Sequence, residues 1–368
     1  MEITCGRDEL SQKLAIVSRG VSTRSAVQIL GGILLRADGG RLELAATDME
    51  ISLRVGLEAE ADGDGAVVVP GRLLTDIVRL LSDGEVRLEY RGAEGVVHLR
   101  CGAAAYDLNT YAAEDFPRLP EVDHDQLFGV EREAFLDTLA RVSRAASRDE
   151  SRPVLTGILV RFEGSKLVMA ATDSYRLSVK ETPLERGPGR EVEAIVPARA
   201  LAELQRISQA SNSETIDIGV QENQVAFGAD GVWLTARRID GQFPNYRQLL
   251  PETFEVEVAL ARQEVLDVIR RAGLMVQRNS PVRLRFAEGE LTVSAQTQDV
   301  GEMRESLPIG YAGDVIEIGF NAEFLRDGIE SVVDDSVRFK LISPLRPGMI
   351  LGEGEEFLYL IMPIRLAG

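Results

Sequence analysis

Cysteine, histidine and tryptophan are scarce in this 368-residue chain, which has two, two and one of them. Cys5 and Cys101 match no metal-binding or redox spacing, so we interpret them as core residues and exclude zinc modules and disulfide scaffolds. No run of 18 apolar residues occurs, and the N-terminal MEITCGRDELSQKL lacks a basic-then-apolar signal pattern. We therefore predict a cytoplasmic protein with no membrane partner.

Motifs for nucleotide binding and catalysis are missing as well. The chain has no G-x-x-x-x-G-K-[ST] loop, and no G-x-G-x-x-G opens a helix after a strand. His98 lies in an expected strand and His124 in an acidic linker, and neither has a nucleophile–base pattern around it. We predict a protein that is not an enzyme and uses no metal or cofactor.

The chain does contain an internal repeat. Residues 154–179 and residues 29–53 share one plan: a glycine, an apolar strand, a glycine-containing turn and a strand ending Ala-Ala-Thr-Asp. Gly32 and Gly157 are 125 residues apart, as are Asp48 and Asp173. A weaker third copy begins at Val282. A period of this length corresponds to a whole domain, so the repeat predicts three similar domains.

We place the three domains at residues 1–125, 126–250 and 251–368. Phe116-Pro117 and Phe243-Pro244, which are 127 residues apart, close the first two. Helical apolar spacing occurs twice in each domain, and short turns join the strands, which favours antiparallel pairing. The expected fold class is α+β, with two helices packed on antiparallel sheets in each domain. Expected helices are 7–24, 71–81, 131–146, 198–209, 261–274 and 321–332. Expected strands include 41–47, 154–162, 166–172, 282–287, 290–297 and 357–364.

Charge is distributed unevenly along the chain. Five helical stretches (7–24, 72–79, 132–148, 199–206 and 262–271) together carry +7, whereas the whole chain carries −18. The other residues therefore carry −25. Solvent-exposed helix faces often carry arginine, which is one explanation. The other is that the helices share a surface that faces a polyanion.

Some features occur in one repeat and not in the others. The shared glycines and Thr-Asp pairs are explained by the fold: glycine by turn geometry, Thr-Asp by local side-chain-to-backbone hydrogen bonds. Residues 174–177 read Ser-Tyr-Arg-Leu, whereas the first repeat has Met-Glu-Ile-Ser at 49–52. The C-terminal segment 358–364 is almost wholly apolar. It completes the third domain as a strand and also offers a candidate binding surface.

Several segments together resemble one protein family. These are YLIMPIRL at the C-terminus, ATDSYRL (171–177), DGQFPNY (240–246) and IGFN (318–321). They are similar to the bacterial DNA polymerase III beta subunit, the sliding clamp, and the resemblance covers the whole chain. It implies a DNA-clamp fold and a head-to-tail homodimer that forms a ring of six similar domains, with helices lining the hole and sheets outside.

The resemblance implies a hydrophobic peptide cleft between the second and third domains. Ser174-Tyr175 stands where the most familiar members have Gly-His, and the loop 344–349 is expected to border the cleft. Apolar walls with one or two guanidinium groups suit a short extended peptide. The matching positions are Leu155, Thr172, Ser174, Tyr175, Arg176, Leu177, Pro244, Leu249, Leu360, Met362, Pro363, Ile364 and Arg365.

The resemblance also implies a DNA-facing surface and a dimer seam. Contacts with duplex DNA in such a ring go to phosphates and carry no sequence preference. For the seam, Tyr106 of the first domain matches one side and Leu274 and Met275 of the third domain match the other. The matching DNA-facing positions are Arg24, Arg72, Arg148, Arg152 and Arg199.

We accordingly predict a processivity factor that encircles duplex DNA and tethers the replicative polymerase. Its expected partners are double-stranded DNA, a second copy of itself, the polymerase, a clamp-loader ATPase and other proteins with short clamp-binding peptides. The alternative is a three-domain cytoplasmic binding scaffold that does not act on DNA, and a hydrolase is a distant third. A stable dimer in solution favours the ring, and a lasting monomer favours the scaffold.

Overall fold

The computed structural model describes residues 1–22, 26–277, 280–354 and 356–366. Its backbone forms two compact units, one of residues 1–132 with 199–238 and the other of residues 133–198 with 239–368. Within the described ranges, no helix combines the length and apolarity needed to cross a bilayer. No group of His, Cys, Asp and Glu in these ranges is arranged to hold a metal ion.

The first unit contains two segments of the chain. The N-terminal segment forms β1 (Glu2–Gly6), α1 (Arg7–Val17), β2 (Gly32–Asp38), β3 (Arg41–Thr47), β4 (Ile51–Glu58), β5 (Glu60–Asp62), β6 (Gly65–Pro70), α2 (Gly71–Leu80), β7 (Glu85–Arg91), β8 (Val96–Cys101), β9 (Ala104–Asn109) and β10 (Phe128–Glu131). The second segment forms most of α5 (Ala198–Gln209), then β15 (Thr215–Val220), β16 (Gln224–Ala229) and β17 (Val232–Arg237).

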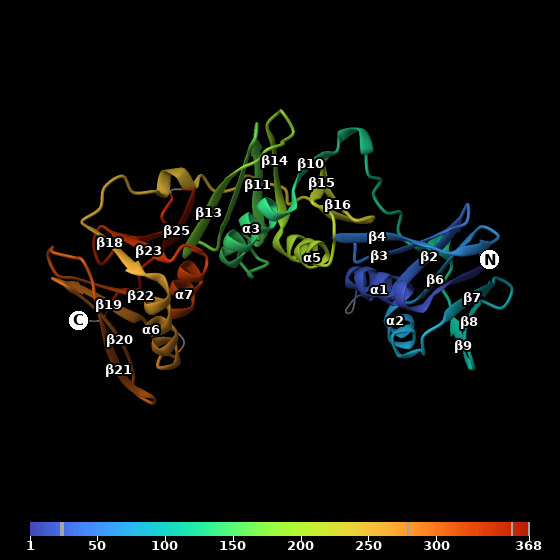
Figure 1. The fold of residues 1–368 in the computed structure, drawn as a ribbon, viewed down its shortest axis with the longest axis horizontal. Helices are drawn as coiled ribbons and strands as arrows, with labels where there is room; N and C mark the ends of the chain where they lie inside the picture. Colours follow the sequence, from blue (N-terminus) through green and yellow to red (C-terminus); the bar gives the residue numbers. More distant parts are fainter. Residues whose placement is uncertain (23–25, 278–279, 355, 367–368) are drawn as a thin grey trace. The chain divides into compact units, whose positions relative to one another are not determined.

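An eight-stranded antiparallel sheet in the order β10-β15-β16-β17-β4-β3-β2-β6 organises this unit. β17 pairs directly with β4, so strands from the first and second repeats share one sheet. A five-stranded sheet, β5-β1-β7-β8-β9, completes the unit. α1 packs on β3 and β4 through Leu10, Leu14 and Val17, which are fully buried, and lies beside α2 (Figure 1).

The second unit also contains two segments. The first forms α3 (Arg132–Val142), α4 (Pro153–Thr156), β11 (Gly157–Glu163), β12 (Lys166–Thr172), β13 (Arg176–Pro183) and β14 (Val192–Pro197). The second forms η6 (Tyr246–Leu249), β18 (Val256–Ala261), α6 (Arg262–Leu274), β19 (Val282–Ala287), β20 (Glu290–Thr297), β21 (Gly301–Pro308), β22 (Ile316–Phe320), α7 (Ala322–Glu330), β23 (Ser336–Leu341), β24 (Gly348–Leu351) and β25 (Phe357–Ile361).

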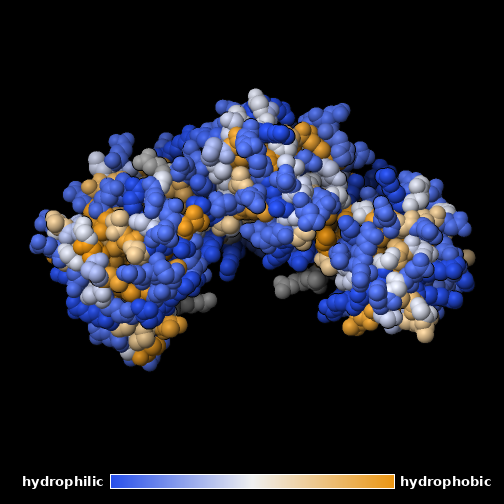
Figure 2. Space-filling view, viewed as in Figure 1, coloured by the Kyte–Doolittle hydropathy of each residue, from blue (hydrophilic) through white to orange (hydrophobic). Residues whose placement is uncertain are grey.

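The second unit repeats the sheet arrangement of the first. Its eight-stranded sheet has the order β14-β11-β12-β13-β25-β24-β23-β18, and a four-stranded sheet has the order β21-β20-β19-β22. β13 of the second repeat pairs with β25 of the third, placing Leu177 opposite Leu360. α6 and α7 lie side by side (Figure 1). On the face shown in Figure 2, hydrophilic side chains cover most of each unit and apolar ones form scattered patches.

The α+β prediction is confirmed, and several elements match closely. α5 has the predicted bounds, as do β3, β12, β19 and β20. The helix expected at 7–24 is shorter in the structure: α1 ends at Val17, a 3-10 turn, Ser18–Gly20, follows it, and Val21 and Ser22 are not helical. The strand expected at 154–162 begins only at Gly157, because Pro153 opens a helical turn. The final strand ends at Ile361, before Pro363.

The shared glycines serve close packing, which corrects their interpretation as turn residues. Gly32 and Gly157 have extended backbones with φ near −98°. A Cβ atom on Gly32 would lie 2.3 Å from Cγ1 of Val68, and one on Gly157 would lie 2.5 Å from Cγ2 of Ile195. Each glycine therefore lets a neighbouring strand approach more closely than any side chain allows.

This packing predicts that Gly32→Ala destabilises the protein by about 1–3 kcal/mol, the usual cost of overpacking a core. Gly56→Ala is the matched control, because Gly56 also lies in a strand but has open space around its Cβ position. The control should be neutral or up to about 1 kcal/mol more stable, since alanine restricts the unfolded chain. Chemical denaturation of both variants measures the difference, and equal midpoints would refute the packing argument.

Candidate peptide cleft and DNA-facing surfaces

A tight turn between β12 and β13 forms the first part of the candidate cleft. The Thr172 hydroxyl donates to the carbonyl oxygen of Arg176 at 2.6 Å and accepts from the Ser174 N–H at 3.2 Å. Oδ1 of Asp173 accepts from the N–H groups of Tyr175 and Arg176 at 2.9 and 3.0 Å. These local bonds, predicted from the Thr-Asp pair, hold Tyr175 exposed at the tip.

The first repeat builds the same turn with a different surface. Thr47 and Asp48 make the matching bonds to residues 49–51. Met49 and Ser174, at equivalent positions, both have φ of 78°, in the left-handed region that favours glycine. Glycine would fit this position without strain, whereas Met49 and Ser174 adopt it at some conformational cost. The backbone is thus common to both repeats, and only the side chains differ.

The C-terminal segment joins this turn through its backbone. The Met362 N–H donates to the carbonyl oxygen of Tyr175 at 2.8 Å, directly after β25 ends. The Ile364 N–H donates to the carbonyl oxygen of Gly319 at 2.8 Å. Tyr175 is 61% exposed and Met362 is 42% exposed, so two large apolar side chains that flank a backbone hydrogen bond face solvent. Such adjacent exposed groups are typical of a binding surface.

The other predicted cleft residues divide into buried and exposed sets. Leu177 and Leu360 face each other across β13 and β25 in one buried cluster with Tyr246 and Met349. Met349, from the segment where a loop was expected, lies in strand β24, so residues 348–351 are not a loop. Leu155 is buried in α4, and Pro363 and Ile364 are half-buried. The exposed members are Pro244, Leu249 and Arg365.

Arg176, a predicted cleft residue, is largely buried in a polar network. Its side chain is 9% exposed, with Nη1 2.5 Å from Oδ2 of Asp327 and Nε 3.0 Å from Oδ2 of Asp173. The guanidinium lies 4.2 Å from the ring centroid of Phe324. The Tyr359 hydroxyl accepts from Arg176 at 3.4 Å and donates to the Phe324 carbonyl oxygen at 2.9 Å.

This network keeps Arg176 charged and Tyr359 neutral. Burial alone would lower the pKa of Arg176, but Tyr359 and Asp327 outweigh it and raise the pKa above its ordinary value. Burial raises the pKa of Tyr359 in turn. Sequence reasoning missed Asp327, because this buried carboxylate of α7 lies on a different face of the helix from the apolar residues Leu325 and Ile329. Removing one partner of such a buried pair typically costs about 3–5 kcal/mol.

The predicted DNA-facing arginines differ in their surroundings. Arg148 is exposed, and no partner contacts its side chain among the described residues. Arg72 is 92% exposed and lies 3.8 Å from Asp76. Arg199 is 2.6 Å from Asp48, so its charge is partly neutralised. Arg152 donates to the Ser174 hydroxyl oxygen at 3.0 Å, which places it with the cleft turn. Arg24 lies outside the described residues.

The predicted seam residues lie near edge strands. Tyr106 is 41% exposed on β9, at the edge of the five-stranded sheet. Leu274, the last residue of α6, is 79% exposed. A bidentate ion pair from Arg271 to Glu305, at 2.6 and 2.8 Å, fixes α6 against the edge strand β21 and lowers the pKa of Glu305. Met275 is half-buried beside them.

The chain matches known proteins over its whole length. Models of the N-terminal, central and C-terminal domains of the DNA polymerase III beta subunit match residues 1–120, 129–245 and 247–365. The chain is 32% identical to the beta sliding clamp of Streptomyces coelicolor and 33% identical to that of Synechococcus elongatus, over 100% of each chain.

Solved structures give the same result. A DNA polymerase sliding clamp from Bacillus subtilis superposes with a TM-score of 0.95 at 26% identity, covering 100% of both chains. A sliding clamp from Pseudomonas aeruginosa bound to griselimycin superposes with a TM-score of 0.92 at 26% identity, again over 100% of both chains. Family models match almost the whole chain, and the chain therefore belongs to the DNA polymerase III beta subunit family, the bacterial sliding clamps.

Proposed function

We propose that this chain is a non-catalytic processivity factor that encircles duplex DNA and tethers a replicative polymerase to it. The observation that carries the proposal is the full-length match to beta sliding clamps, together with the repeated sheet architecture. Two copies joined head to tail would close a ring of six similar domains. A closed ring would keep this protein on DNA even though its net charge of −18 repels the phosphates of DNA from its outer surface.

The peptide cleft in this proposal lies around Tyr175, Met362 and Leu249. All three are large apolar side chains that are at least 42% exposed. A short extended peptide with apolar anchors could cover them. Griselimycin bound to the Pseudomonas clamp shows that a relative holds a ligand, which supports the presence of a binding surface in the family. The polymerase, the clamp loader and other clients would compete for this cleft.

The DNA-facing surface in this proposal consists of helices and the loop that carries Arg148. Most helical arginines, including Arg144, Arg206 and Arg270, lie in ion pairs within the chain. The net attraction for phosphate is therefore weaker than a count of arginines suggests. Weak, non-specific contacts suit a clamp, since a ring held by topology must slide.

The seam in this proposal joins β9 of one copy to β21 of the next. Both are edge strands whose outer backbone groups can pair with another chain. Tyr106 on β9 would meet Leu274 and Met275 beside β21. The domain boundaries at residues 125 and 250 likewise remain predictions.

The seam predicts that Tyr106→Ala combined with Leu274→Lys produces a monomer. The contact loses apolar area and gains an unpaired charge, at a cost on the order of several kcal/mol. Tyr175→Ala with Val315→Lys is the matched control, because both residues are exposed and lie outside β9, α6 and β21. Light scattering gives the mass. A dimer that persists in the seam variant would place the interface elsewhere.

The proposed DNA-facing surface predicts that Arg72→Glu with Arg148→Glu weakens binding to linear duplex DNA. The slope of the logarithm of the binding constant against the logarithm of the salt concentration should fall in magnitude by about one unit per lost phosphate contact. Arg100→Glu with Arg190→Glu changes the charge equally on other exposed residues and should have less effect. Retention on closed circular DNA should suffer less than binding to linear DNA. Equal losses on both would argue against encirclement.

The cleft predicts that Met362→Asp weakens binding of a polymerase-derived clamp-binding peptide about tenfold or more, while the dimer remains. Val315→Asp, at a residue that is 58% exposed, is the control and should bind normally. Deleting residues 364–368 should abolish binding too, but it also removes the bond from Ile364 to Gly319. Fluorescence anisotropy measures the affinity, and full-strength binding by Met362→Asp would overturn the cleft.

A further inference from the structure

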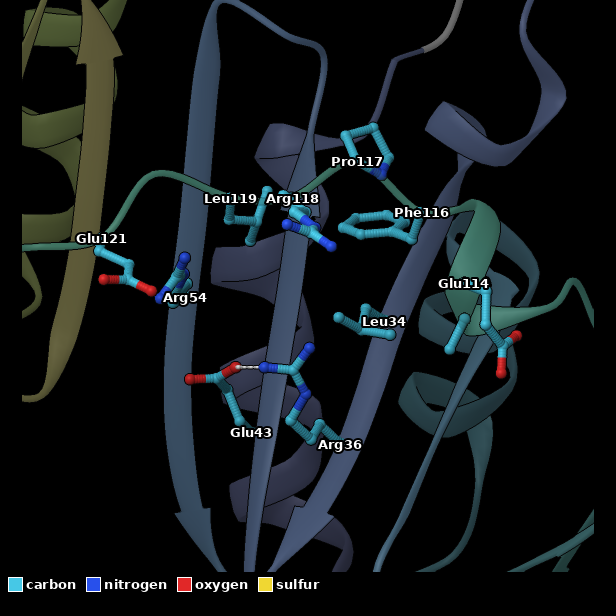
Figure 3. Close-up of a pocket in the computed structure, with 11 residues that line it drawn as sticks. Leu34, Arg36, Glu43, Arg54, Glu114, Phe116, Pro117, Arg118, Leu119 and Glu121 are labelled. Carbon is cyan, nitrogen blue, oxygen red and sulfur yellow. Dashed lines mark ion pairs between the residues drawn. The ribbon is translucent and has the colours of Figure 1, made fainter.

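A second groove lies in the first unit, where the linker after β9 crosses the eight-stranded sheet. We call it the linker groove. It consists of two adjacent cavities of about 470 and 330 Å³, both lined by Pro117, Arg118 and Leu119. Figure 3 shows these linker residues lying over the strands that carry Leu34, Arg36, Glu43 and Arg54.

The linker is held firmly on the sheet, so the groove is part of the fold. Phe116 is buried in a cluster with Leu34, Ala45 and Val68. Arg54 donates to the carbonyl oxygen of Pro120 at 2.9 Å. Further along, the His124 ring packs edge-on against Trp233, with centroids 5.2 Å apart. A groove with rigid walls can bind a ligand without an entropic cost for ordering them.

The linker groove occupies the same place in its repeat as the proposed cleft does in the next. Pro117 and Pro244 are equivalent positions, and Met49 is equivalent to Ser174. The Arg237 N–H donates to the carbonyl oxygen of Glu50 at 3.0 Å, as the Met362 N–H does to Tyr175 at 2.8 Å. Both grooves therefore border a positive-φ turn that is hydrogen-bonded to the end of a strand from the following repeat.

The side chains of the two grooves differ in charge. Arg118 and Arg237 stand where the second repeat junction has Asn245 and Met362. Both arginines are exposed, and neither guanidinium has a partner among the described residues. Glu50 is the single carboxylate of the smaller cavity, and it lies 3.9 Å from Arg199. The smaller cavity thus has a positive lining in a protein with a net charge of −18.

Apolar and polar groups complete the lining of the smaller cavity. Met49 is 63% exposed and offers an apolar wall beside Leu119 and Pro117. Thr235, which is 5% exposed, adds a hydroxyl-bearing side chain to the lining. One cavity thus combines apolar side chains with two uncommitted guanidinium groups, which suits a peptide that carries both carboxylates and an apolar side chain.

We infer that the linker groove binds an acidic, extended peptide segment of a partner protein. Two carboxylates pair with Arg118 and Arg237, and an apolar side chain between them packs on Met49 and Leu119. The adjoining cavity is lined by Glu43, Glu114 and Glu121 as well as by arginines, so we expect the carboxylates of the peptide to lie in the smaller cavity. The inference extends the proposed function and does not depend on the cleft at Tyr175 and Met362.

The test uses the full-length protein labelled with ¹³C at its methionine methyl groups. Met49 marks the linker groove and Met362 marks the cleft, and the leucine variants Met49→Leu and Met362→Leu assign their signals. The probe is a seven-residue peptide of alternating aspartate and leucine, and a lysine–leucine peptide is its control. We expect the acidic peptide to shift the Met49 signal to saturation, and the basic peptide to leave it unchanged.

Variants then test the two arginines. Arg118→Ala and Arg237→Ala should each weaken binding of the acidic peptide about tenfold, because each loses a charge-assisted contact. Arg190→Ala, at an exposed arginine of the second unit, should bind as the unaltered protein does. An unmoved Met49 signal, or equal binding by all three variants, would overturn the inference.

Two further outcomes would assign the groove or the peptide differently. A shift of Met362 without Met49 would place the acidic peptide in the cleft and overturn the linker groove. A twelve-base-pair duplex that shifts Met49 with the same dependence on Arg118 and Arg237 would make the groove a nucleic-acid site, which also overturns it. Binding of a polymerase-derived peptide at Met362 tests the proposed function separately, so the two can fail independently.

Discussion

Backbone pairing between strands of successive repeats is the interaction on which the rest of this structure depends. β4 pairs with β17, and β13 pairs with β25, so each eight-stranded sheet takes strands from two repeats. The pairing places the end of a strand from one repeat beside the Thr-Asp turn of the repeat before it. Both the proposed cleft and the linker groove lie at these junctions. A change in register would move every lining residue to the opposite face.

One backbone design thus supports two surfaces of different chemistry. Thr47-Asp48 and Thr172-Asp173 build equivalent turns, and the following strand is attached to each by one N–H bond. At one junction the exposed residues are Tyr175 and Met362, whereas at the other Arg237 takes the place of Met362. The side chains on this repeated scaffold therefore determine what each surface can bind, as in other folds that support many different functions.

Local patterns allowed much of the fold to be predicted, and non-local contacts explain what was missed. Helical spacing identified α5 to the residue, and the Thr-Asp pair predicted its own hydrogen bonds, because both depend on neighbours in sequence. Arg176 was placed in the cleft, but its buried partner Asp327 is 151 residues away and comes close only through the β13–β25 pairing. Arg199 was counted as a free charge, although Asp48 of another repeat partly neutralises it.

The shared sheets have a consequence for how the chain can be divided. The two compact units split the second repeat, since residues 133–198 belong to one and residues 199–238 to the other. A fragment cut at the repeat boundaries would leave β13 and β17 without their partners β25 and β4. Exposed strands of this kind invite aggregation. We therefore expect the segments that fold and unfold cooperatively to be out of phase with the repeats of the sequence.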